Sequence, residues 1–264
     1  MSPEGREGAS LPRTHGAGAS APRIHGAVAS LPRTHGAGAS APRLSIIVPV
    51  LDEAAAISAL LDDLAPLRQH AVELIVVDGG SSDATVARCA GRADTILESQ
   101  RGRALQMNAG AALARGELLL FLHADTVLPS GAAEAVLDAL AEGADWGRFD
   151  VRITGRSMMF PVISALMNAR SRWTGIATGD QAIFVRRSVF AAVGGFPAQA
   201  LMEDVELSRR LRQISRPACL RLRVATSGRR WESRGVWRTI WLMWRLRWRY
   251  WRGTPADALA EAYR

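Results

Sequence analysis

Several features that are common in proteins are scarce or absent in this sequence. It contains no lysine, and all 33 of its basic residues are arginine. Its two cysteines, Cys89 and Cys219, are too few for a disulfide framework and suit a reducing compartment. No stretch of about 18 residues is apolar and free of charge, so no transmembrane helix is expected. The start of the chain lacks the apolar segment of a signal peptide. We therefore expect neither a disulfide-rich secreted domain nor an integral membrane protein.

A glycine-rich phosphate loop is also missing. After the first apolar run the chain reads Pro49-Val50-Leu51-Asp52-Glu53, without the glycines that let a backbone approach a pyrophosphate. This absence disfavours a dinucleotide-binding fold of the NAD type and a P-loop protein. It also disfavours a nucleotidyltransferase, in which a glycine-rich basic loop follows the first strand. A nucleotide held by carboxylates and a metal ion remains compatible with the sequence.

Acidic residues are scarce in one region only. The net charge is +8, but residues 209–252 contain 14 arginines and a single acid, Glu232. This region carries +13, so the rest of the chain carries −5. Because the positive charge is confined to the C-terminal part, a nucleic-acid surface over the whole body is not indicated.

Residues 9–43 repeat with a period of ten, as in ASLPRTHGAG followed by ASAPRIHGAV. They are rich in Pro, Gly, Ala and Ser and show no apolar periodicity, so they cannot bury enough surface to offset their ordering entropy. We predict that residues 1–43 are disordered. The recurring His15, His25 and His35 are too far apart on a flexible chain to favour metal binding.

From Leu44 onward, apolar runs alternate with helical patterns. This alternation predicts an α/β fold with a mostly parallel central sheet and helices on both faces. Ligands of such sheets bind beyond the carboxyl ends of the strands. Asp52, Asp78 and Asp125 all follow predicted strand ends, so we expect them to converge on one site. Strands are predicted at 44–50, 72–78, 93–99, 117–123, 145–153, 177–187 and 219–227, and the main helices at 54–67, 103–114, 132–141, 157–171 and 202–213.

Five segments in this region carry motifs: IIVPVLDE (46–53), IVVDGGSSDAT (75–85), GRALQMNAGAALARGELLLFLHADT (102–126), GDQAIFVRRSVFAAVGGFP (179–197) and MEDVELSRRL (202–211). In this order they resemble family 2 glycosyltransferases, which have the GT-A fold. Within that family the sequence most resembles a bacterial subgroup labelled selenodomain-associated transferases. The resemblance implies a GT-A domain at 44–228, followed by a basic Trp/Arg-rich helical segment at 229–264.

The resemblance assigns nucleotide binding to the ends of the first two strands. Pro49 and Glu53 match the family's P-x-x-N-E segment, in which Asp52 stands in place of the usual Asn. Asp78 matches the aspartate that accepts a hydrogen bond from the base, and a carboxylate suits the imide N–H of uracil. The alternative role for Asp78 is to cap the following helix.

The resemblance also places a donor diphosphate site. Arg103 and Asn108, with Arg101, fall in the segment beside the donor, where arginine meets phosphate; solvated surface charge is the alternative for the arginines. His123-Ala124-Asp125 falls on the family's D-x-D motif, whose last aspartate binds Mn²⁺ or Mg²⁺ on the diphosphate. Asp125 keeps this metal role. His123 replaces the first aspartate and either touches the sugar or ribose or fills space; a lone histidine at a strand end is more often a hydrogen-bonded structural group than a metal ligand.

Catalysis is assigned to a pair of acids at the start of a predicted helix. Glu203-Asp204 matches the family's E-D pair, in which the aspartate is the general base of inverting members. The alternative is that these acids only favour the helix dipole. Asp180 and Gln181 match a segment that lines the donor or acceptor sugar pocket.

The C-terminal segment RRWESRGVWRTIWLMWRLRWRYWRG (229–253) contains six of the eight tryptophans, interleaved with arginine. As a helix it is amphipathic, like helices that lie on anionic membranes. Packing on the catalytic domain and binding of single-stranded nucleic acid are the alternatives, and the acidic body disfavours the latter.

Together these features indicate a metal-dependent inverting glycosyltransferase that uses a nucleotide sugar, UDP-linked such as UDP-glucose. We expect a lipid-like acceptor, such as a carotenoid or polyisoprenoid acid or alcohol, and a peripheral location on the cytoplasmic face of the cell membrane. The alternative hypothesis is a non-catalytic membrane- or nucleic-acid-binding protein with a degenerate transferase core, suggested by His123 and Asp52.

Overall fold

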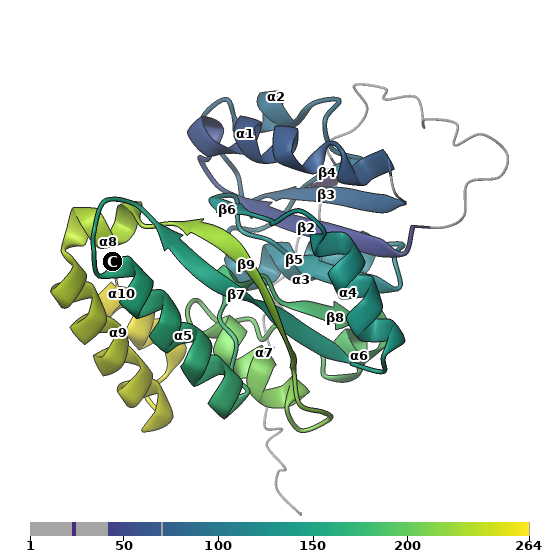
Figure 1. The fold of residues 1–264 in the computed structure, drawn as a ribbon. Helices are drawn as coiled ribbons and strands as arrows, with labels where there is room; N and C mark the ends of the chain where they lie inside the picture. Colours follow the sequence, from purple (N-terminus) through teal and green to yellow (C-terminus); the bar gives the residue numbers. More distant parts are fainter. Residues whose placement is uncertain (1–22, 25–41, 70, 264) are drawn as a thin grey trace, which may run out of the picture.

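The computed structural model describes residues 23–24, 42–69 and 71–263. They form one nine-stranded sheet in the order β1-β4-β3-β2-β5-β8-β7-β9-β6, with helices on both faces (Figure 1). The strands are β1 (Arg23–Ile24), β2 (Leu44–Val50), β3 (Val72–Asp78), β4 (Thr95–Glu98), β5 (Leu118–Phe121), β6 (Thr126–Val127), β7 (Trp146–Thr154), β8 (Phe184–Arg186) and β9 (Ala218–Ser227). The helices are α1 (Ala54–Leu64), α2 (Thr85–Cys89), α3 (Arg103–Leu113), α4 (Ala132–Ala141), α5 (Phe160–Thr174), α6 (Arg187–Ala192), α7 (Glu203–Leu211), α8 (Arg229–Arg234), α9 (Val236–Trp251) and α10 (Ala256–Tyr263), with short 3-10 helices η1 (Leu67–Gln69) and η2 (Gly179–Gln181).

The predicted disorder of residues 1–43 falls almost entirely outside the described residues. Within them, β1 pairs antiparallel with β4 at the sheet edge.

Strands β4, β3, β2 and β5 are parallel neighbours in the first half of the sheet. Their side chains alternate between two cores: Ile46 and Val48 pack with α1 and α4, whereas Ile47 packs with α3 and α6. Because both faces are covered, β2 and β3 are apolar almost throughout, as expected for a parallel sheet. The predicted α/β fold, with a mostly parallel sheet and helices on both faces, is confirmed.

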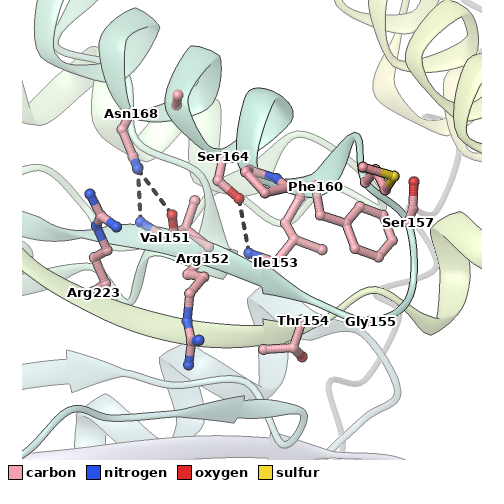
Figure 2. Close-up of a pocket in the computed structure, with 13 residues that line it drawn as sticks. Val151, Arg152, Ile153, Thr154, Gly155, Ser157, Phe160, Ser164, Asn168 and Arg223 are labelled. Carbon is pink, nitrogen blue, oxygen red and sulfur yellow. Dashed lines mark hydrogen bonds between the residues drawn. The ribbon is translucent and has the colours of Figure 1, made fainter.

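The second half of the sheet is mixed. β8 pairs antiparallel with β5 and β7, and β7 runs parallel to β9. Beyond Gly147, β7 leaves β8, and α5 satisfies amides on its open edge: Ser164 Oγ accepts from the Ile153 amide at 2.9 Å, and Asn168 Oδ1 accepts from the Val151 amide at 2.8 Å (Figure 2). Side chains of a helix thereby protect a strand edge from other chains.

The C-terminal segment differs from the single helix predicted at 229–253. Gly235, at φ +84°, separates α8 from α9. A positive φ costs glycine little, and the chain turns there. α8 and α9 pack beside α5 through Trp231, Val236 and Ile240 (Figure 1). Within the described part of the chain, no helix combines the length and apolar character needed to cross a bilayer.

Candidate active site

A cavity of about 530 Å³ lies at the carboxyl ends of β2 and β5, between the sheet on one side and α7 and the C-terminal helices on the other. It collects many of the residues that the sequence singled out. The predicted residues that line it are Pro49, Glu53, Arg101, Arg103, His123, Asp125, Asp180, Glu203 and Asp204. Asp52, Asp78, Asn108 and Gln181 do not line it.

Asp52 and Asp78 tie the loops after β2 and β3 to each other. Asp52 has a φ of +52°, a conformation that Asp and Asn adopt more readily than most residues, and its Oδ1 accepts from the Ser82 amide at 2.8 Å. Asp78 is buried, and its Oδ2 accepts from the amides of Gly80 and Ser81 at 3.0 and 2.9 Å. Both carboxylates shape the loop edge of the site. Base binding by Asp78 stays a prediction, as does the nucleoside contact of Asp52.

Asn108 and Gln181 hold backbone segments behind the cavity. The Asn108 amide donates to the Phe196 carbonyl at 2.8 Å and accepts from the Phe196 amide at 2.9 Å, so it fixes the loop before α7. Gln181 is fully buried, and its Oε1 accepts from the Thr178 amide at 3.2 Å in a capping box over η2. In this structure both side chains position backbone, and their predicted contacts with donor or sugar stay predictions.

Gln106 is a residue that the sequence reasoning missed. It is buried on α3, and its Nε2 donates to the carbonyls of Val50 and Val77, both at 2.8 Å. Val50 is the last residue of β2 and Val77 the next-to-last residue of β3, so one side-chain amide joins the two strand ends at the cavity. One signal in the sequence could have identified it. Gln106 lies on the apolar face of α3, which packs against the sheet, and a polar side chain on such a face needs a hydrogen-bond partner.

Asp125 and Glu53 bring two carboxylates together at the sheet side of the cavity. Strand β5 ends at Phe121, earlier than the predicted residue 123, so Asp125 lies in the following loop. Burial and the charge of Asp125 raise the pKa of Glu53, and the arginines Arg229 and Arg230 oppose this shift. The two carboxylates are therefore close enough to interact.

These acids fit a divalent cation bound with its substrate. Among the described residues there is no group of three or more His, Cys, Asp or Glu side chains arranged to hold a metal ion. Mg²⁺ and Mn²⁺ in phosphate-handling enzymes need only one or two protein carboxylates, because substrate phosphates and water complete the shell. Asp125, with Glu53 beside it, supplies such a partial set.

His123 faces the same cavity as a neutral imidazole. Burial lowers its pKa to about 3, and the nearby positive charges of Arg103 and Arg230 add to this shift. Its ring lies against Gly179, where an added Cβ would come within 2.6 Å of the ring atoms Cε1 and Nε2. A glycine at 179 is therefore required for the histidine to occupy this position.

Glu203 and Asp204 open α7 at the far side of the cavity. Burial raises the pKa of Glu203 to about 7, Asp204 adds to the shift, and Arg103 opposes it through a hydrogen bond of 3.3 Å. Asp204 is held by the amides of Gly179 and Val205, each at 2.7 Å.

The residue before this pair, Met202, has a φ of +63°, unusual for a residue with a side chain. Such strain persists only where the surroundings enforce it. The buried Met202 packs against Leu246 of α9 and Leu259 of α10, and this packing fixes the start of α7.

The C-terminal helices supply a wall of the cavity, in line with the alternative that this segment packs on the catalytic domain. Arg230, Trp231, Arg247 and Tyr263 line it. Arg230 donates to the Tyr263 hydroxyl and lies over its ring, at 5.4 Å from the centroid. The Trp/Arg pattern marked this segment as amphipathic, but a pattern alone does not say which residues face the catalytic domain.

A second cavity, of about 490 Å³, lies between α5 and the strands β7 and β9 (Figure 2). The polar side chains of Ser164 and Asn168 in its lining are already hydrogen-bonded to the backbone of β7. It contains no carboxylate, histidine or cysteine among its lining residues. The first cavity is therefore the candidate active site.

Solved structures define the class of fold. A mannosyltransferase from Pyrobaculum calidifontis in complex with GDP-Man and Mn²⁺ superposes with a TM-score of 0.59 at 22% identity, covering 85% of this chain and 70% of that one. Glucosyl-3-phosphoglycerate synthase from Mycobacterium tuberculosis, with Mn²⁺, UDP and phosphoglyceric acid, gives 0.54 at 19%, covering 70% and 69%. The predicted GT-A fold is confirmed.

The family follows from the sequence match. The model of glycosyl transferase family 2 matches residues 45–194, and the chain belongs to this family. A PGL/p-HBAD biosynthesis glycosyltransferase of Mycobacterium tuberculosis is 33% identical over 172 residues, which are 58% of this chain and 62% of the relative. The chain thus spans about three fifths of the length of this relative.

Proposed function

We propose that the protein is an inverting glycosyltransferase that transfers a sugar from a UDP-linked donor, such as UDP-glucose, with the help of Mn²⁺ or Mg²⁺. The observation that carries the proposal is the convergence of Asp125, Glu203 and Asp204 on one cavity of a family 2 fold. Neighbours of the same fold were crystallised with UDP or GDP-Man and with divalent cations, which supports the donor class.

In the proposed mechanism Asp204 is the proton acceptor. The acceptor hydroxyl oxygen forms a bond to the anomeric carbon while the bond from that carbon to the diphosphate breaks, and Asp204 takes the hydroxyl proton. Its two amide donors leave lone pairs on both oxygens for this proton. A divalent cation held by Asp125, with Glu53 beside it, would neutralise charge on the departing diphosphate.

The proposal of a UDP-linked donor is tested by measuring UDP release and UDP binding. We expect UDP release from at least one UDP-sugar with Mn²⁺, and a D125N variant that binds UDP at least about tenfold more weakly with Mn²⁺ than wild type. E142Q, which changes an exposed carboxyl group, is the matched control. No UDP release from a full panel of UDP-sugars, together with unchanged UDP binding by D125N, would contradict the proposal.

The exposed face of α9 supports a location at a membrane surface. Five tryptophans form a stripe opposite the buried Leu246 and Thr239, and their exposed fractions range from 57% to 81%. The stripe consists of Trp237, Trp241, Trp244, Trp248 and Trp251. Arg245 and Arg252 lie over the rings of Trp241 and Trp248, at 4.8 and 5.1 Å. Exposed tryptophan beside arginine suits the headgroup region of an anionic bilayer.

From this face we infer a lipid-like acceptor and a peripheral position on the inner face of the cell membrane. The test is flotation with phosphatidylglycerol vesicles. Replacement of Trp244 and Trp248 by Ser should release the protein from the vesicles, because much of the apolar face is lost. Equal flotation of this variant and wild type would contradict the inference. The carotenoid or polyisoprenoid nature of the acceptor, and membership of the selenodomain-associated subgroup, also belong to this proposal.

A non-catalytic binding protein is the second candidate, favoured by the neutral His123 where the family motif has an acid. Binding of vesicles or RNA, without affinity for any nucleotide sugar, would support it. Nucleic acid is not expected as a partner, because the positive charge is confined to the C-terminal part of the chain.

A further inference from the structure

Two arginines at the helix side of the cavity lack hydrogen-bond partners that would explain their burial. Arg247 of α9 lines the cavity, and its Nε is shielded from solvent without a partner. Arg170 of α5 lies behind it, with Nε and Nη2 in the same condition. Over the part of the chain that the structure describes, no ion pair within 4.0 Å reaches either guanidinium. Buried polar groups without partners are uncommon, and each one calls for an explanation.

The two guanidinium groups repel each other. Burial lowers the pKa of Arg170 to about 10, and the positive charge of Arg247 adds to this shift. Asp180 and Asp204 act in the opposite direction, so the four charges share one corner of the site. Two adjacent positive charges with free donors form a site for an anion, because charge-assisted hydrogen bonds to carboxylate or phosphate are strong.

Two of the other arginines that line the cavity are already engaged, and the third, Arg101, is exposed. Arg103 pairs with Glu203 at 3.3 Å, and Arg230 bonds to Tyr263. The arginines that lower the pKa of Glu53 at the sheet side are Arg229 and Arg230. Arg247 is instead grouped with Asp180, on the side of the general base.

We propose that Arg247 binds an anionic group of the acceptor, a carboxylate or a phosphate, and that Arg170 is a positioning residue behind it. The proposal rests on the proposed function, in which Asp204 takes the proton of the acceptor hydroxyl. An anion on Arg247 places the rest of the acceptor beside Asp204 and relieves the repulsion between the two arginines. A neutral lipid alcohol leaves the Arg247 donors unpaired, so the site selects an acidic amphiphile.

The experiment measures anion binding directly. Full-length protein saturated with UDP and Mn²⁺ is titrated calorimetrically, at constant ionic strength, with inorganic phosphate, acetate and neutral acetamide. We expect wild type to bind phosphate or acetate, and acetamide not at all. The R247Q variant should bind the preferred anion at least about tenfold more weakly. R221Q, which removes an exposed arginine outside both cavities, is the matched control and should bind like wild type. The preference between phosphate and acetate identifies the acidic group.

The role of Arg170 has its own readout. R170Q should weaken anion binding by a smaller factor than R247Q, whereas R170K, which keeps the positive charge, should restore it. Both variants should keep the wild-type affinity for UDP. Equal weakening by R170Q and R170K would indicate a packing role and overturn the positioning assignment.

Three results would overturn the anion site. One is the absence of any anion binding to wild type, and another is equal binding by R247Q and R221Q. The third is loss of UDP affinity in R247Q, which would assign Arg247 to the donor diphosphate. The titrations are repeated without UDP. Failure of wild type to bind UDP then counts against the proposed function, while the anion data still decide the status of Arg247.

Discussion

The two sides of the cavity are built by different means. The sheet side includes Pro49, near the end of β2, and Glu53 and Asp125, which follow the neighbouring parallel strands β2 and β5 within a few residues. The helix side consists of α7 and the C-terminal helices, whose site residues include Glu203 and Arg247. The first arrangement is local, since strand direction alone brings the residues to one edge. The second depends on how separate helices pack.

This difference predicts which side tolerates change. The sheet side rests on β2 and β5 in the interior of the sheet, between two apolar cores. The helix side rests on a small core around Met202, Leu246 and Leu259. Damage to that small core should alter the helix side and leave the sheet side in place.

The largest effect is expected from D204N. Replacing a general base removes about 10²- to 10⁴-fold in rate, so kcat for transfer to a hydroxyl acceptor should fall about a thousandfold. UDP affinity with Mn²⁺ should stay unchanged, because the sheet side is intact. Transfer assays and UDP titration of the same preparation give both readouts. Full activity of D204N toward this hydroxyl acceptor would contradict the role of Asp204 as general base.

A large effect on stability is expected from L246A. Leu246 is fully buried in the small core, and such truncations cost about 2 to 5 kcal/mol. W244A removes a larger side chain from the opposite, exposed face of α9 and is the control; it should cost under about 1 kcal/mol. Urea unfolding measures both, and hydrogen exchange locates the change. If L246A raised the exchange rate, relative to wild type, more in β2 and β5 than in α9, this result would contradict the separation of the two sides.

The sequence revealed the sheet side well and the helix side in part. Asp125 was singled out because it follows a recognisable apolar strand, whereas Glu53 was singled out through the family motif. Asp52 and Asp78 also follow strands but do not line the cavity. Asp204 was found only through the family motif. Arg247 and Tyr263 were missed, because periodicity defines the faces of a helix but not its partner. Arg170 was missed for the same reason.

One predicted contact and one predicted helix show a related limit. Asn108 matched a segment beside the donor, but its amide is bonded to the backbone of Phe196, 88 residues later. The break at Gly235 lay inside a continuous apolar and arginine pattern. The residue pattern reveals neither a long-range hydrogen bond of this kind nor the point at which a helix breaks.

A smaller effect is expected where the two sides meet, at His123 and Gly179. G179A would place a methyl group 2.6 Å from the His123 ring, so the ring or η2 must move, at a cost of about 1 to 3 kcal/mol. The shift also disturbs the Gly179 amide that holds Asp204. H123A combined with G179A removes the clash, so the double variant should recover much of the stability lost in G179A. Thermal unfolding of the set measures the coupling; additive losses would show that the ring and residue 179 do not interact.

The smallest effect is a pH dependence that belongs to the helix side. Because burial raises the pKa of Glu203 to about 7 from the ordinary 4.5, the folded protein keeps this proton to a higher pH than the unfolded chain. The unfolded state therefore binds fewer protons in this window, and this group makes stability fall as pH rises from about 4.5 to about 7.

E203Q removes this titration while its amide still accepts a hydrogen bond from Arg103. We expect its stability to fall less than that of wild type between pH 5 and pH 8, by at most about 3 kcal/mol. Urea unfolding at several pH values gives the two profiles, with the exposed E142Q as a control that should follow wild type. Parallel profiles for E203Q and wild type would mean that the Arg103 ion pair fully offsets the burial of Glu203. The helix side would then be no more sensitive to pH than the sheet side, and the contrast between them would rest on packing alone.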